Sequence, residues 1–247
     1  MTDFQPPITD SDPEADNLTA ILEMIESGSS AVDELIEALH QQTEDLHDIV
    51  ALTILGEMGD KRAFDPLLKA LKHEFVDVRR SAAAALGYLK DTRAVPELIA
   101  LLYDADSQVR GSAVQALGQL GDERAVEALV LRLWDADSWV RQSAAQALGR
   151  LRSIAAVDTL IAALRDEAAW VRQSAAIALG DIRDVRATNP LIKALHDTSS
   201  NVRSAAAEGL ALLGDPRAAE ALVSALTDEH MGVRKAAYSA LKTLGEV

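Results

Sequence analysis

The sequence predicts an all-α solenoid, a superhelix of about seven 31-residue helix pairs preceded by an N-terminal capping helix. The pair Val-Arg recurs at intervals of 31 residues, from Val78-Arg79 to Val233-Arg234. A leucine column follows the same interval, and an Asp-x-Arg-Ala motif marks the other half of most units. A period of this length is typical of stacked units that bury one another's apolar faces.

Each unit shows the pattern of two helices joined by a turn. Residues 125–134 place apolar side chains at i, i+3, i+4 and i+7, which predicts a first helix. Residues 135–138, Asp-Ala-Asp-Ser, supply turn and N-cap chemistry before a second helix predicted over residues 139–151. Gly121 suits a helix end at positive φ. An alanine column in the second helices, including Ala144, predicts close packing between neighbouring units.

The repeat also sets the expected domain organisation. Residues 1–16 are polar, contain three prolines and show no apolar period, so we expect an acidic disordered tail. Residues 17–247 are expected to form one repeat domain, in which Gln41–Glu44 make an irregular turn. Its predicted parts are a cap helix at 17–30 and units at 31–61, 62–92, 93–123, 124–154, 155–185, 186–216 and 217–247.

Composition excludes several classes of function. The 247 residues include no cysteine, which excludes disulfides, thiolate metal sites and a cysteine nucleophile. The net charge of -15 disfavours binding to nucleic acid. Neither a membrane-spanning run nor a signal peptide is visible. We therefore expect a soluble, cytoplasmic protein.

The negative charge is concentrated at the N-terminal end. Residues 1–60 carry fifteen acidic residues and no lysine or arginine, whereas residues 61–247 are balanced at 24 of each sign. The acidic region is either a solubilising extension or a docking arm for a basic partner.

The repeat unit resembles a known class. Asp-x-Arg-Ala-Val-x-x-Leu, then Leu-x-Asp-x-Asp, then Val-Arg-x-x-Ala-Ala-x-Ala-Leu-Gly stands almost unaltered at residues 122–149. This unit is similar to the phycobilisome-lyase-type HEAT repeat, and the resemblance covers residues 60–247 and, weakly, 31–59. It implies a HEAT-like solenoid. Such repeats occur in cyanobacterial phycobilin lyases, phycobilisome-degradation factors, protein-binding scaffolds and a di-iron hydroxylase, so the resemblance leaves the function open.

The arginines of the Val-Arg pairs are expected to be structural. An aspartate column with the same period accompanies them, which predicts a ladder of Arg–Asp ion pairs between units. Its arginines are Arg79, Arg110, Arg141, Arg172, Arg203 and Arg234.

Candidate binding residues are those that depart from the repeat on the second helices. They lie 3, 4 and 4 residues apart and share one face, which second helices of such solenoids turn toward the concave side. This stripe predicts a surface for a protein partner made by Trp139, Trp170, Gln142, Gln173, Gln146, Arg150, Gln115, Tyr88 and Arg80. Tyr103 and Trp134 are expected at its edge, clustered with the two stripe tryptophans. The alternative is that these tryptophans pack across the turns between units.

Catalytic chemistry is sparse. Of five histidines only His73 is followed by a glutamate, and one His-Glu pair cannot build a two-metal site. We expect neither metal nor cofactor. The first hypothesis is a non-catalytic scaffold that holds a protein partner on its concave face. The second, implied by the resemblance, is a phycobilin lyase subunit or lyase-like chaperone for phycobiliproteins. A bilin would need basic groups near aromatics, and Arg80 lies about 20 Å from Trp139 at ~10 Å per unit.

Overall fold

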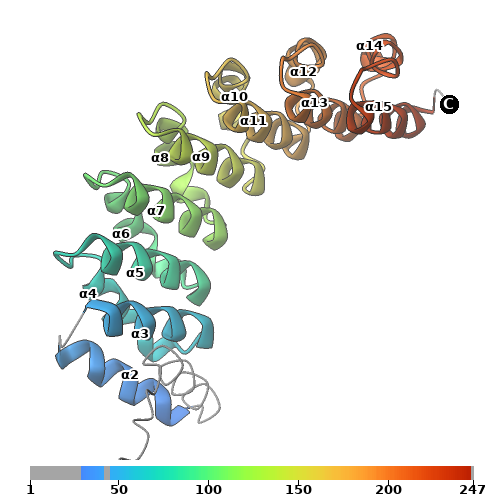
Figure 1. The fold of residues 1–247 in the computed structure, drawn as a ribbon. Helices are drawn as coiled ribbons and strands as arrows, with labels where there is room; N and C mark the ends of the chain where they lie inside the picture. Colours follow the sequence, from blue (N-terminus) through green and yellow to red (C-terminus); the bar gives the residue numbers. More distant parts are fainter. Residues whose placement is uncertain (1–28, 42–44, 246–247) are drawn as a thin grey trace, which may run out of the picture.

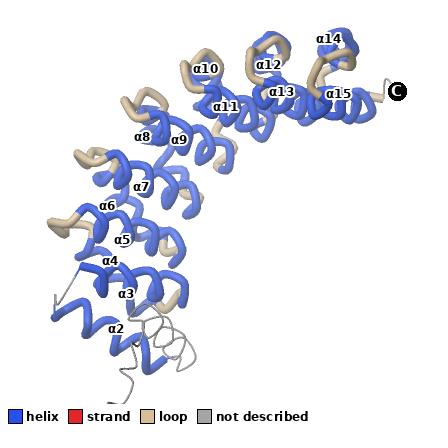
Figure 2. The backbone as a smooth tube through the Cα atoms, viewed as in Figure 1, coloured by secondary structure: helices blue, strands red, loops and turns tan. Residues whose placement is uncertain are grey.

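The computed structural model describes residues 29–41 and 45–245, and these form helix pairs stacked into an open arch (Figure 1). Helices and short loops account for all of the described backbone, which contains no strand (Figure 2). The predicted solenoid is therefore confirmed. The tail at 1–16, nearly all of the cap helix at 17–30, and most of the irregular turn at 41–44 lie outside the described residues.

Successive helices alternate between two layers. The first helices of the pairs are α2 (Ser29–Gln41), α4 (Phe64–Ala70), α6 (Val95–Leu101), α8 (Val126–Arg132), α10 (Val157–Ala163), α12 (Thr188–Ala194) and α14 (Ala219–Ala225). The second helices are α3 (Asp45–Met58), α5 (Val76–Leu89), α7 (Ser107–Leu120), α9 (Ser138–Arg150), α11 (Ala169–Ile182), α13 (Ser200–Leu213) and α15 (Met231–Leu244).

From α4 onward, the first helices are shorter than their apolar period predicts. Residues 125–134 do not form one continuous helix, because a 3₁₀ turn at Glu123–Ala125 precedes α8 and α8 ends at Arg132. The side chain of Asp122 caps this turn by accepting the backbone N–H of Arg124. Capping by aspartate fixes the tighter turn locally, and the apolar spacing cannot reveal that change of geometry.

Small residues bring the second helices together. The alanine column is fully buried, as Ala144 and Ala175 illustrate. Gly118 lies in the last turn of α7, where an added Cβ would fall 2.8 Å from the Cβ of Ala147 on α9. Contacts of this kind let neighbouring second helices lie closer together than neighbouring first helices, which are separated by larger side chains. The arch therefore bends with its second helices inside, as α11, α13 and α15 show beneath α10, α12 and α14 (Figure 1).

The predicted helix end at Gly121 is confirmed. Gly121 caps α7 with a φ of 68°, and its N–H donates to the carbonyl oxygen of Leu117. This left-handed conformation is accessible to glycine without the Cβ clash that other residues meet.

Candidate interaction surface

The repeated arginines bridge each unit to the next at the turn between the two helices. Nε and Nη2 of Arg110 donate to the carboxylate oxygens of Asp135 at 2.9 and 2.8 Å. Its Nη1 donates to the backbone carbonyl oxygens of Asp104 and Ala105. The same geometry joins Arg79 to Asp104, Arg110 to Asp135, Arg141 to Asp166, Arg172 to Asp197, and Arg203 to Asp228.

The last arginine of the ladder differs from the others. Nη1 of Arg234 donates to the carbonyl oxygens of Asp228 and Glu229, but Arg234 has no carboxylate partner among the described residues. The other five arginines are held by ion pairs and backbone bonds at once. Their role is to join units, and they leave few donors for a partner.

The ladder also sets the charge of its aspartates. Burial raises the pKa of Asp135, but hydrogen bonds from Arg110 and from the backbone N–H of Asp137 outweigh it. The pKa of Asp135 therefore lies below its ordinary value, and the carboxylate stays ionised at neutral pH. In the 3₁₀ turns the Arg124 hydrogen bond lowers the pKa of Asp122 to about 2.

The predicted stripe lies on the second helices, on the inner side of the arch (Figure 1). At its N-terminal end, Tyr88 of α5 is exposed. Arg80 is half-buried and donates through Nη2 to Asp77 at 2.9 Å, while its buried Nε has no hydrogen-bond partner. The Asp77 contact engages the guanidinium of Arg80. Arg150, further along the stripe, is exposed and makes no ion pair within the part of the chain that the structure describes.

The middle of the stripe is rich in side-chain amides. Its six glutamines lie on α7, α9 and α11, and all are exposed or half-buried. Only the Gln146 amide is hydrogen-bonded within the described chain, through a 3.4 Å contact from Nε2 to Ser174 Oγ. The other five amides are open to a partner, and they are Gln108, Gln115, Gln119, Gln142 and Gln173.

The two stripe tryptophans have different environments. A Cβ added to Gly111 of α7 would fall 2.0 Å from Cζ3 of Trp139, so this ring lies directly against the backbone of the preceding unit. Trp139 is half-buried, as the packing alternative predicts. Trp170 is 52% exposed beside the exposed Ile177 of α11. Trp170 therefore presents more apolar surface to a partner than Trp139 does.

The expected cluster of four aromatic side chains does not form. The one ring–ring contact in the described chain joins His73 and Phe75. Tyr103 and Trp134 are 65% and 69% exposed at the turn edge. They lie in successive units, and neither ring makes a ring contact with Trp139 or Trp170. Trp134 instead lines a hollow formed with residues of the next unit, among them Thr159 and Arg165.

One residue that sequence reasoning passed over holds this edge together. Arg132 lies with its guanidinium carbon 4.8 Å from the centre of the Tyr103 ring, and its Nη1 donates to the carbonyl oxygen of Leu102. The corresponding positions in the other units are alanine or leucine, as at Ala70 and Leu101. That departure from the column is the signal that could have identified it.

Within residues 29–41 and 45–245, no cluster of three or more His, Cys, Asp or Glu is arranged to hold a metal ion. None of the helices in the same ranges combines the length and apolar character needed to cross a bilayer.

Solved structures with this architecture include proteins of several kinds. A chain of the complex of CpcE and CpcF of phycocyanin lyase from Nostoc sp. PCC7120 is 27% identical, covering 85% of this chain and 86% of that chain at a TM-score of 0.58. An engineered protein is 25% identical over 72% of this chain and 95% of its own, with a TM-score of 0.57. A designed armadillo repeat protein in complex with the peptide (KR)4 shares the fold at 21% identity, 72% and 98% coverage and a TM-score of 0.57.

No curated protein matches the sequence. The model of the family described as HEAT repeats matches residues 32–87, 64–149, 131–200 and 188–247, which together span nearly all of the solenoid. This chain belongs to the HEAT-repeat family.

Proposed function

We propose that the protein is a non-catalytic scaffold that holds a protein partner on the inner face of α7, α9 and α11. The observation that carries this proposal is the set of five glutamine amides without a hydrogen-bond partner in the described chain. An amide offers both a donor and an acceptor, so it suits the peptide groups and polar side chains of another polypeptide.

The surface around these amides supports the same proposal. Trp170 supplies a large, exposed apolar side chain, and tryptophan is among the residues that contribute most to protein interfaces. Among the stripe positions of α7, α9 and α11, only Arg150 and Asp181 near the C-terminal ends of α9 and α11 are charged, although the chain has a net charge of -15. Depletion of charge at the centre with an aromatic anchor is the composition of an interface core.

The test compares two pairs of alanine substitutions. Trp170→Ala with Gln142→Ala alters the inner face, whereas Trp134→Ala with Tyr103→Ala removes two exposed aromatic side chains from the turn edge. Partners are captured from source-cell lysate by cross-linking and identified by mass spectrometry, and affinity for the purified partner is then measured by calorimetry. We expect the inner-face pair to weaken binding by at least about tenfold and the edge pair to leave it unchanged.

Two results would contradict this assignment. Unchanged affinity after the inner-face substitutions would show that the amides and Trp170 are not the binding surface. A loss confined to the edge pair would move the binding surface to Tyr103 and Trp134. Circular dichroism of each variant separates lost binding from lost folding.

A second candidate is a phycobilin lyase subunit or lyase-like chaperone, with a phycobiliprotein as partner. The favouring observation is the 27% identity to a chain of the phycocyanin lyase complex. Arg150 and Trp170 would then meet the bilin, since Arg80 is already engaged by Asp77. Added phycocyanobilin should gain absorbance and fluorescence on binding, and Arg150→Gln should reduce both. An unchanged bilin spectrum at micromolar protein would exclude this role.

A further inference from the structure

A groove on the outer side of the arch is independent of the inner face. It has a volume of about 550 Å³ and lies between the end of α2 and the surface of α4 and α6. Leu39, Pro66 and Leu68 supply apolar lining. A second hollow of about 410 Å³ shares Leu68 with it and extends the groove to Tyr103.

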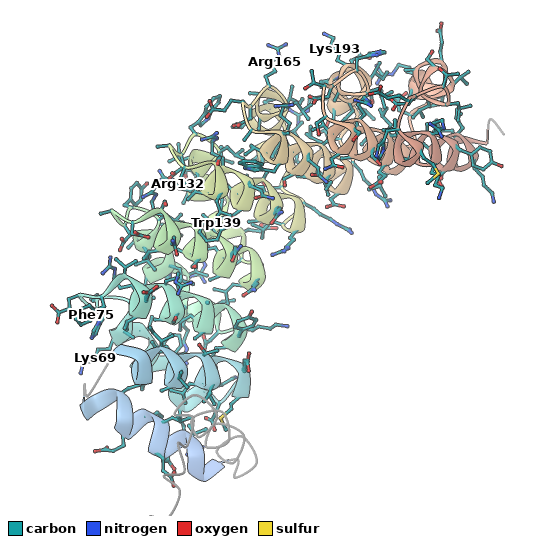
Figure 3. All side chains as sticks on the ribbon, in the orientation of Figure 1. Lys69, Phe75, Arg132, Trp139, Arg165 and Lys193 are labelled. Atoms are coloured by element: carbon teal, nitrogen blue, oxygen red, sulfur yellow. The ribbon has the colours of Figure 1, made fainter. Side chains whose placement is uncertain are left out.

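Two lysines and two glutamates line this groove. Lys69 and Lys72 are exposed, both line the groove, and neither has an ion-pair partner among the described residues. Lys69 projects from the outer side of the arch (Figure 3). Glu74 and Glu97 lie at the same rim, so the groove combines an apolar floor with both signs of charge.

Residues 1–16 have the complementary composition. They contain five acidic residues and no basic residue, together with the apolar side chains of Phe4 and Ile8. An acidic segment with two apolar anchors can place its apolar side chains on the floor and its carboxylates at Lys69 and Lys72, away from Glu74 and Glu97. We propose that residues 1–16 of the chain dock into the groove between α2, α4 and α6.

The connection to the described chain is long enough for this docking. Twelve residues separate Asp16 from Ser29, where α2 begins. They span about 18 Å as a helix and about 40 Å when extended. Leu39, at the groove, lies ten residues along α2, about 15 Å from Ser29. Asp16 can therefore reach the groove in either conformation, and docking within one chain benefits from a millimolar effective concentration.

The chain contains no cysteine, so only the introduced cysteines react with the spin label and the distance between the two labels can be assigned directly. One spin label is attached at Thr9→Cys of the full chain, and the other at Ala105→Cys, an exposed turn position beside the groove. Thr198→Cys is the matched reference, since it occupies the same repeat position three units further on, about 30 Å away. Pulsed electron paramagnetic resonance gives the distance distribution for each pair.

Docking predicts a narrow, short distance distribution for the Thr9–Ala105 pair and a longer one for the Thr9–Thr198 pair. Lys69→Glu with Lys72→Glu should lower the docked fraction by about tenfold, and 0.5 M salt should lower it as well. The matched control is Arg165→Glu with Lys193→Glu, because these exposed residues share the repeat positions of Lys72 and Lys69. The control should leave the distribution narrow.

Three outcomes would overturn the proposal. A broad Thr9–Ala105 distribution in the unaltered groove would show that the segment does not dock. A narrow distribution that persists after Lys69→Glu and Lys72→Glu would place the segment elsewhere on the molecule. A narrow distance between two singly labelled chains, mixed in equal amounts, would assign the contact to a second copy. None of these outcomes bears on partner binding by the inner face.

Discussion

The substitution Arg141→Met tests how much the inter-unit ladder stabilises the solenoid. Methionine keeps most of the aliphatic stem and removes every hydrogen-bond donor. Arg141 and Asp166 are 9% and 11% exposed in their side chains, and Nε and Nη2 reach the carboxylate at 2.7 and 3.0 Å. Nη1 also donates to the carbonyl oxygens of Asp135 and Ala136.

The matched reference is Arg234→Met. Arg234 makes the same pair of backbone contacts, but no carboxylate of the described chain pairs with it. Losing the backbone contacts alone should cost about 1 kcal/mol. Arg141→Met also strands the nearly buried carboxylate of Asp166, which brings the expected loss to about 3–4 kcal/mol. The difference of about 2–3 kcal/mol between the two variants measures what one Arg–Asp ion pair between units adds to the free energy of unfolding.

Equilibrium unfolding in urea, followed by circular dichroism at 222 nm, provides the free energy of unfolding. If the free energy of unfolding depends less steeply on urea concentration in the variant, the array unfolds in parts, as stacked repeats can. Adding Asp166→Asn to Arg141→Met should recover about 1–2 kcal/mol, because the unpaired charge is then removed. Equal losses for Arg141→Met and Arg234→Met would refute the reasoning, since the ion pair would then add nothing to the backbone contacts.

Three further predictions concern packing and charge. Ala144→Asp should unfold several units, because it buries an unpaired charge at a fully buried position; loss of ellipticity measures this, and Ala144→Ser should remain folded. Gly111→Ala should displace the Trp139 ring and shift its emission to longer wavelength, measured with the other two tryptophans replaced by phenylalanine; unchanged emission would contradict the contact. The lowered pKa of Asp122, about 2 in the folded chain against 3.8, adds stability above pH 4 that is lost as pH falls toward 2. Thermal unfolding between pH 7 and 2.5 should show this loss, and Asp122→Asn should reduce it.

Much of the fold could be predicted because every unit repeats the same sequence pattern. The Val-Arg and aspartate columns share one interval, and stacking at that interval brings Arg110 to Asp135 without further information. The alanine column predicted close packing for the same reason. The 3₁₀ turn capped by Asp122 was missed, because its apolar spacing is compatible with a continuous helix.

The candidate site was less predictable because it depends on pairs of departures from the repeat. The sequence singles out Trp139, but only the stacking of α9 on α7 places its ring against Gly111. Likewise, Arg132 matters because Tyr103 stands in the preceding unit. The grouping of Tyr103 and Trp134 with the stripe tryptophans was wrong, because the stacked backbone holds these rings apart and no ring contact joins them.

The close contacts between second helices, such as that of Gly118 with Ala147, set the curvature of the inner face and therefore the size of partner that fits it. Interaxial distances of about 8 Å between second helices and about 10 Å between first helices, in layers about 10 Å apart, turn each unit by about 11°. The resulting radius of curvature is about 40 Å, whereas a globular domain of 100 residues has a radius of about 17 Å. A domain of this size is more strongly curved than the inner face, so it contacts the face along about 30 Å, which corresponds to three units. The six glutamines of the stripe occupy three successive second helices, α7, α9 and α11.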